Sequence, residues 1–148
     1  MVEHPAVPVF AVTLYAVLIF LGRTYFRNRE AWNWRVAMAF WNLFLSVFSA
    51  IGFARAFPAL VHTWTHYNIE ENFCFDPESH FASGSTGLWV LAFVLSKFPE
   101  LFDTFFIVIH KKPLIFLHWY HHISVLLYCW HSYVNRAPHG IIFVVMNY

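Results

Sequence analysis

Charged side chains are scarce in this chain of 148 residues. Aspartate, glutamate, lysine and arginine together make up 11% of it, against about 25% in a typical soluble protein. Hydrophobic residues make up 59%, and the mean hydropathy is +0.53. A soluble domain of this size could not bury so much apolar surface, so the composition indicates a membrane protein. The net charge of +1, without a basic patch that contains aromatic residues, argues against a nucleic-acid partner.

Cysteines are also few, and this excludes a disulfide framework. Cys129 lies in an apolar stretch and is predicted to be a small buried residue, whereas Cys74 lies in a polar segment. Cys129 is therefore a poor partner for Cys74, whose partner could lie beyond residue 148.

Long apolar runs predict an all-α, polytopic membrane protein with about four complete transmembrane helices and the start of a fifth. The runs cover residues 6–22, 36–53, 88–109 and 114–130, and a fifth begins in "IIFVVMNY". That last run is too short to cross a bilayer, which takes roughly 20 residues. We therefore expect residues 1–148 to form one transmembrane domain that is truncated at its C-terminal end.

The basic residues indicate how these helices cross the membrane. Two connections hold most of them, namely Arg23, Arg27, Arg29 and Arg35 in the first and Lys111 and Lys112 in the second. Arg55 and Arg136 fall on the other side. The positive-inside rule therefore places both basic connections in the cytoplasm. The polar loop that begins with "HTWTH" is expected in the lumen or outside the cell.

Four polar residues interrupt the third apolar run, in "SKFPELFDT". Lys97, Glu100, Asp103 and Thr104 are spaced i, i+3, i+6 and i+7, which places them on one face of a helix. Ionisable residues at membrane depth are costly and by default indicate a functional site. Lys97 and Glu100 can pair, and a purely structural ion pair is the alternative interpretation.

Three histidines occupy the fourth run, in "LHWYHHIS". His118, His121 and His122 are spaced i, i+3 and i+4, again one helical face. If the third and fourth runs form a hairpin, Asp103 and His121 lie about 12–14 Å from its turn at a rise of 1.5 Å per residue. The two polar faces are therefore predicted to share one cavity, although packing roles for the histidines are the alternative.

Other histidines carry a weaker signal. His62 and His66 in "HTWTH" have the i, i+4 spacing of some metal ligands, but we favour surface packing for them. His110, His131 and His139 lie near the ends of the predicted spans, where a packing role and a functional role are equally compatible with the sequence.

The segments "KFPELFDT" and "HWYHH" resemble the KxxExxDT and HxxHH motifs of the fatty acid elongases. These are membrane 3-oxoacyl-CoA synthases of the endoplasmic reticulum, and the likeness is closest to the branch for long saturated and monounsaturated chains. Pro113 stands where polyunsaturated-chain elongases often carry glutamine. The resemblance implies a multi-pass bundle of seven helices, of which this chain is the first half, with a tunnel for the acyl chain.

The resemblance also implies that Asn147 begins the next motif, and that Cys74 pairs with a cysteine in the missing half. The implied reaction condenses a long-chain acyl-CoA with malonyl-CoA and requires no cofactor. The implied partners are these two substrates, the lipid bilayer, and the reductase and dehydratase enzymes of the elongation cycle.

The site expected from this resemblance consists of eight polar side chains. His121 is the expected nucleophile, and His118 and His122 would tune its tautomer, stabilise the enolate or transfer protons. Asp103 would orient a histidine N–H. Lys97, Glu100, Thr104 and Asn147 would bind substrate or support the site, and Lys111 and Lys112 could contact CoA phosphates.

Three alternatives stay open. The histidine box could bind a metal that stabilises the enolate, although no further ligand set is evident and no metal site is expected. A di-iron membrane desaturase or hydroxylase also uses HxxHH boxes, but it needs about eight histidines in three boxes. A structural or receptor-like membrane protein would use the buried charges only to pair its helices.

Overall fold

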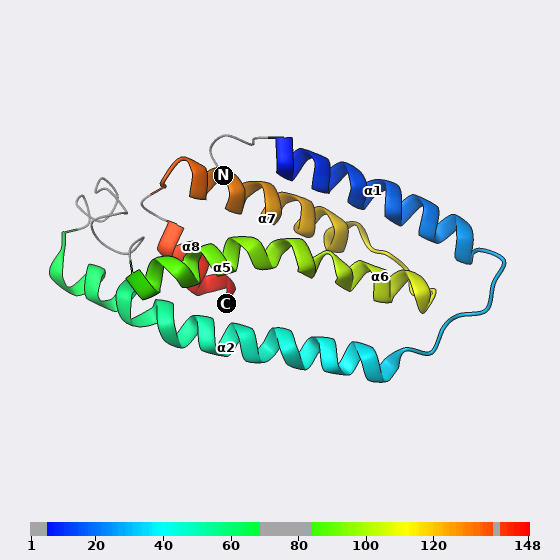
Figure 1. The fold of residues 1–148 in the computed structure, drawn as a ribbon, viewed down its shortest axis with the longest axis horizontal. Coiled ribbons are helices and arrows are strands. Elements are labelled where there is room, and N and C mark those ends of the chain that lie inside the picture. The colour runs from blue at the N-terminus through cyan, green and yellow to red at the C-terminus, as the bar shows by residue number, and fades with distance from the viewer. Residues whose placement is uncertain (1–5, 69–83, 138–139) are drawn as a thin grey trace. The chain divides into compact units, whose positions relative to one another are not determined.

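A computed structural model describes residues 6–68, 84–137 and 140–148 of the chain (Figure 1). Those residues form six α-helices and no strand: α1 (Ala6–Phe26), α2 (Arg35–His66), α5 (Gly84–Glu100), α6 (Phe102–Ile109), α7 (Phe116–Val134) and α8 (Gly140–Asn147). The all-α prediction is therefore confirmed. Cys74, His139 and the acidic residues of the predicted loop lie outside the described residues.

Helices α1 and α2 are long and apolar enough to cross a membrane. They have 21 and 32 residues, and their most apolar segments have mean hydropathies of 2.0 and 1.8. Most of the side chains in these segments are exposed rather than packed inside the protein, as is expected for helices that contact lipid. The polytopic membrane architecture predicted from composition is confirmed.

Helix α2 is longer than predicted. The loop expected to begin at "HTWTH" is wrong, because these residues are the last part of α2. The apolar run was expected to end at residue 53, but the helix continues to His66 and includes Pro58. The hydroxyl groups of Thr63 and Thr65 bond to carbonyls of the preceding turn, so polar residues here do not interrupt the helix. At 1.5 Å per residue, α2 is about 48 Å long, which exceeds the roughly 30 Å of a bilayer core.

The third predicted span consists of two helices, α5 and α6, rather than one (Figure 1). Pro99 has no N–H to donate and disturbs the end of α5. Leu101, between the helices, donates its N–H to the carbonyl of Phe98, and Thr104 donates to that of Leu101. These i to i−3 bonds make a tight turn, so Asp103 and Thr104 lie in the first turn of α6.

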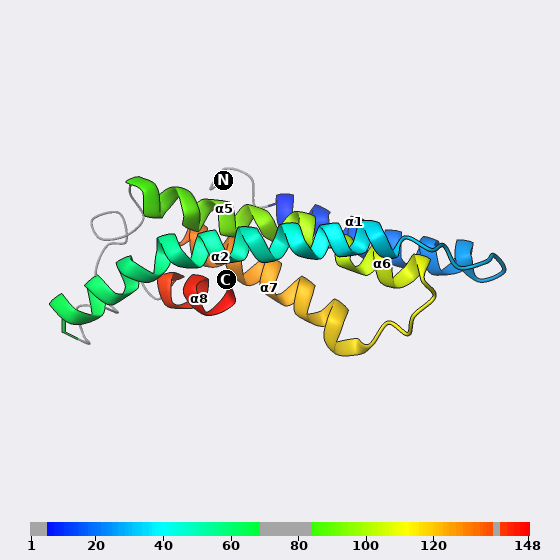
Figure 2. The same ribbon diagram turned by 90° about the horizontal axis from the view of Figure 1, so that it is seen from below.

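The turn after α6 has a well-defined hydrogen-bond pattern. Lys111 has a positive φ of 52°. It donates its N–H to the carbonyl of Val108, while Lys112 donates to that of Ile107. This pair of bonds is a Schellman motif, which usually places glycine at the position of Lys111. A connection without regular secondary structure, up to residue 115, then leads to α7, which runs in the opposite direction to α6 (Figure 2).

The described residues belong to two compact units. The first contains residues from Met1–Asn42 and Ser96–Trp130, and the second residues from Leu43–Leu95 and His131–Tyr148. In the first unit, α1 packs against α6. Its core contains Phe26, Phe106, Val108 and Ile109, with Met38 and Trp41 beside them.

Aromatic rings form much of the second unit. The Tyr148 hydroxyl donates to the carbonyl of Trp89 at 2.8 Å, and its ring meets Phe48 and Phe93. A Cβ at Gly52 would overlap the Tyr148 ring, so this ring lies directly on the backbone of α2.

Candidate active site

One hydrogen bond joins the two sequence motifs. The hydroxyl of Thr104, in the first turn of α6, lies 3.0 Å from Nε2 of His118 in α7. Both residues belong to the first unit, and Thr104 is only 1% exposed. The predicted convergence of two polar helical faces is therefore present in the structure at this pair.

The two residues that meet are not the two that the sequence predicted to lie at the same height. That prediction paired Asp103 with His121 by assuming helical residues on both sides of the turn, but α7 begins only at Phe116. The residues before it are not helical, and a non-helical chain can advance by up to about 3.3 Å per residue rather than 1.5 Å. Fewer residues can therefore cover the same height, and it is His118 that meets Thr104.

Tyr15 of α1 extends this contact to a third helix. Its hydroxyl lies 2.6 Å from that of Thr104, and the residue is only 5% exposed. We did not predict this residue from the sequence. The available signal was a tyrosine in the middle of an apolar run, whereas membrane tyrosines usually gather at the interfaces.

The hydroxyl of Thr104 has one proton, and two arrangements of the chain from Tyr15 to His118 use that proton within the chain. In the first, Tyr15 donates to Thr104, and Thr104 donates to an unprotonated Nε2 of His118. In the second, a protonated Nε2 of His118 donates to Thr104, which donates to Tyr15. Either arrangement holds His118 in one tautomer and one orientation. A catalytic base, or a group that assists a neighbouring nucleophile, requires this.

The three histidine rings lie close to one another on α7. The ring centroids of His118 and His122 are 4.6 Å apart, and those of His121 and His122 are 5.7 Å apart. His118 and His122 are half-buried, whereas His121 is exposed. The Tyr15 ring also approaches His122, at 6.5 Å. The box therefore presents His121 outward and holds its two neighbours against the protein.

Asp103 contacts a different helix. Its carboxylate accepts a hydrogen bond of 2.6 Å from Nε1 of Trp41 in α2, a partner that we did not predict from the sequence. Among the described residues, no hydrogen bond joins Asp103 to a histidine. Its place in the first turn of α6 also puts its charge near the positive end of the helix dipole. A role for Asp103 in orienting a histidine therefore stays a prediction.

The predicted pair of Lys97 and Glu100 is confirmed. The ammonium group lies 2.7 and 2.9 Å from the two carboxylate oxygens. Ser96 donates a further hydrogen bond of 3.0 Å to the same carboxylate. Lys97 is 8% exposed, so the pair neutralises two charges that would be costly to bury singly.

The structure shows no hydrogen bond, among the described residues, from the other predicted residues to this arrangement. Asn147 belongs to the second unit and donates to the carbonyl of Phe143. The rings of His62 and His66 stack at 4.2 Å on the exposed end of α2. Within the described part of the chain, no group of three or more histidine, cysteine or acidic side chains could hold a metal ion. Cys129 is buried and unpaired with another cysteine, as predicted.

The fold and this site define a class: an all-helical, polytopic membrane protein with a histidine box bonded to a polar helix motif. Comparison with known proteins is more specific. The family model described as "ELO: GNS1/SUR4 family" matches residues 1–148. The chain belongs to this family.

Curated relatives agree with this assignment. "Very long chain fatty acid elongase 6" of Drosophila melanogaster is 44% identical over 91% of this chain and 42% of its own length. The protein of the same name in Homo sapiens is 43% identical over 91% of this chain and 50% of its own. "Fatty acid elongase 3" of Trypanosoma brucei brucei is 36% identical over the whole chain and 57% of its own length. The chain spans about half the length of these relatives, and no solved structure matches it.

Proposed function

We propose that the protein carrying this chain catalyses the condensing step of fatty acid elongation. A long-chain acyl-CoA and malonyl-CoA would give a 3-oxoacyl-CoA two carbons longer, with release of CO₂ and CoA. The hydrogen bond between Thr104 and His118 carries the proposal, because it joins the two motifs within one unit. The names of the relatives and the family support it.

The histidine box supports a covalent route for this reaction. The imidazole of His121 would attack the thioester carbonyl, the C–S bond would break, and CoA would leave as the thiol, with the proton that the imidazole loses. Malonyl-CoA would then lose CO₂, its carbanion would attack the acyl-imidazole carbonyl, and the C–N bond would break, with the leaving imidazole taking up one proton from water. The acyl-imidazole is about as reactive as the thioester, so one hard step becomes two easier ones.

Exposure and contacts suggest how the three histidines divide this work. His121 is the exposed ring of the box, and a nucleophile must be reachable by a long substrate. His118 is held by Thr104, and His122 lies between the other two rings. We therefore assign proton transfer or enolate stabilisation to His118 and His122. All bonds balance without a redox group, so we propose that no cofactor is required.

The wider setting is part of the same proposal. The location would be the endoplasmic reticulum membrane, with a reductase and a dehydratase acting on the product. The relatives named for very long chains support a long-chain acyl-CoA as substrate. Lys97 and Glu100 would set the local field or brace the helix pair of the predicted hairpin, and Asn147 would bind substrate or have a structural role.

The covalent route can be tested directly in the full-length protein. Incubation with a long-chain acyl-CoA alone should add an acyl group to the α7 peptide that contains His121, seen by mass spectrometry. Hydroxylamine should remove the group, since acyl-imidazoles are labile. Continued turnover with an unmodified peptide would rule out the covalent route.

Substitution of His121 tests its role independently of the other histidines of α7. His121→Ala should abolish both acylation and condensation while the protein still inserts into membranes. His131→Ala is the matched control, because it removes an exposed histidine of the same helix that bonds to Asn135. Retained condensation in His121→Ala would remove this residue from the chemistry.

A further inference from the structure

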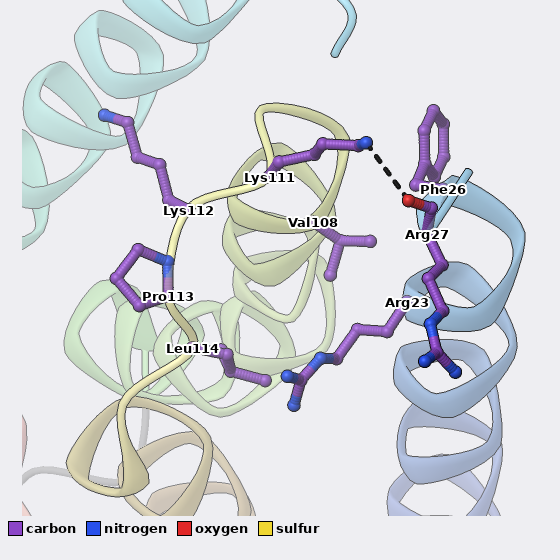
Figure 3. A pocket seen from close by; sticks show the side chains of 8 residues that line it. All are labelled: Arg23, Phe26, Arg27, Val108, Lys111, Lys112, Pro113 and Leu114. Carbon is purple, nitrogen blue, oxygen red and sulfur yellow. Dashed lines mark hydrogen bonds between the residues drawn. The ribbon is translucent and has the colours of Figure 1, made fainter. Parts of the chain in front are cut away.

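A basic pocket lies where the end of α1 meets the turn after α6 (Figure 3). Its volume is about 360 Å³, at the lower end of the roughly 300–1,000 Å³ of small-ligand sites. Four cations line it: Arg23, Arg27, Lys111 and Lys112. The rest of the lining is apolar, and no acidic side chain belongs to it.

The backbone fixes one of these cations in place. The left-handed φ of Lys111 costs energy for any residue other than glycine. From this position the side chain reaches the residue that follows α1, and its ammonium group lies 3.4 Å from the carbonyl oxygen of Arg27 (Figure 3). Figure 3 also shows the Arg23 guanidinium directed toward Leu114, whereas the Lys112 ammonium group points away from α1.

The electrostatic balance of the pocket is positive. Helices α1 and α6 both end here, and each contributes about −0.5 charge from its dipole. These two ends sum to about −1, against four side chains of charge +1. The negative ends of the two helices therefore offset only about one of the four positive charges.

The surroundings suggest a ligand that is both charged and apolar. A second hollow on α1 shares Arg23 and Arg27 with the pocket and continues along the helix past Ile19 and Phe20. Phe20 is 71% exposed and lies in a segment predicted to contact lipid. A ligand at the cations could therefore lay an acyl chain along α1, which a soluble phosphate compound could not do.

We propose that this pocket binds the phosphate of an anionic phospholipid, with one acyl chain along the exposed face of α1. The cations lie at the end of a membrane helix, at the level where lipid headgroups gather. The four charges suit a phosphate monoester, such as that of phosphatidic acid, better than a zwitterionic headgroup. The site is separate from the histidine box and does not depend on the condensing activity.

Lipid titration of the purified full-length protein in detergent, followed by native mass spectrometry, tests the proposal. Phosphatidic acid should bind more tightly than phosphatidylcholine of the same acyl chains. Arg23→Gln should weaken phosphatidic acid binding about fivefold, the effect expected for one interfacial cation. Lys111→Gly should do the same without loss of thermal stability, because glycine suits the left-handed position.

Two control variants remove cations that do not line the pocket. Arg35→Gln removes a charge from the same basic connection, and Arg136→Gly removes the cation with φ of 51° from the corresponding turn after α7. Both should leave the affinity for phosphatidic acid within a factor of about two. Equal weakening by test and control variants would show a diffuse charge effect and overturn the site.

A competition experiment distinguishes lipid from substrate as the source of the phosphate. Excess coenzyme A should leave phosphatidic acid bound if the pocket is a lipid site. If coenzyme A displaces the lipid and the Arg23→Gln variant no longer shows this displacement, the lipid assignment is overturned. The pocket would then bind the substrate. No preference for phosphatidic acid over phosphatidylcholine would also overturn the lipid assignment.

Discussion

Replacing Tyr15 by phenylalanine removes one hydroxyl group from a buried contact between α1 and α6. That hydroxyl lies 2.6 Å from the hydroxyl of Thr104, which in turn lies 3.0 Å from Nε2 of His118. The aromatic ring stays in place, so packing against α6 changes little. The substitution therefore tests whether the first helix holds the histidine box through a hydrogen bond.

The expected loss depends on which way the hydrogen bonds run. If Tyr15 donates to Thr104, the substitution removes one ordinary bond, worth about 0.5–1.5 kcal/mol. If Thr104 donates to Tyr15, the substitution leaves a buried hydroxyl donor unpaired, which costs about 1–3 kcal/mol. If the smaller loss, about 0.5–1.5 kcal/mol, is entirely a loss of transition-state stabilisation, kcat/KM falls roughly 2- to 13-fold.

The assay measures 3-oxoacyl-CoA formation from acyl-CoA and malonyl-CoA, together with thermal stability in detergent. Tyr25→Phe is the matched control, since this tyrosine of α1 is 52% exposed and its ring lies under the guanidinium of Arg29. Thr104→Val removes both hydrogen bonds at once. Adding Tyr15→Phe to Thr104→Val should therefore cause little further loss. Unchanged kinetics and stability in Tyr15→Phe, or full additivity with Thr104→Val, would refute the reasoning.

Two further substitutions test the packing of the first unit. Glu100→Gln removes the carboxylate that neutralises the buried Lys97 and should lower stability by about 3 kcal/mol or more, measured by thermal unfolding. Lys97→Met combined with Glu100→Leu should restore the lost stability. Failure of this double variant would argue against a structural ion pair. Gly22→Leu should separate α1 from α6, because a Cβ there already lies 3.1 Å from the Val108 side chain. The melting temperature should fall, whereas Ala16→Leu at an exposed position should leave it unchanged; equal effects would place the contact elsewhere.

Much of the architecture could be predicted because a bilayer restricts it. Long apolar runs without charges are expected to form helices in lipid, since a helix satisfies the backbone hydrogen bonds within one segment. Helix ends were less predictable: α2 continues to His66, and threonine hydroxyls there bond to carbonyls of the same helix. The break at Leu101 follows Pro99, but the tight turn between α5 and α6 could not be located from periodicity.

Composition and apolar periodicity were enough to predict a membrane protein and two helical faces with clustered polar residues. The sequence also predicted the Lys97–Glu100 pair, because residues three apart on one helix are neighbours wherever that helix packs. The contacts between Thr104 and His118, between Tyr15 and Thr104, and between Asp103 and Trp41 appear only once the helices are packed together. Such contacts depend on the rotation of each helix and on the irregular connection before α7, and local spacing in a sequence records neither.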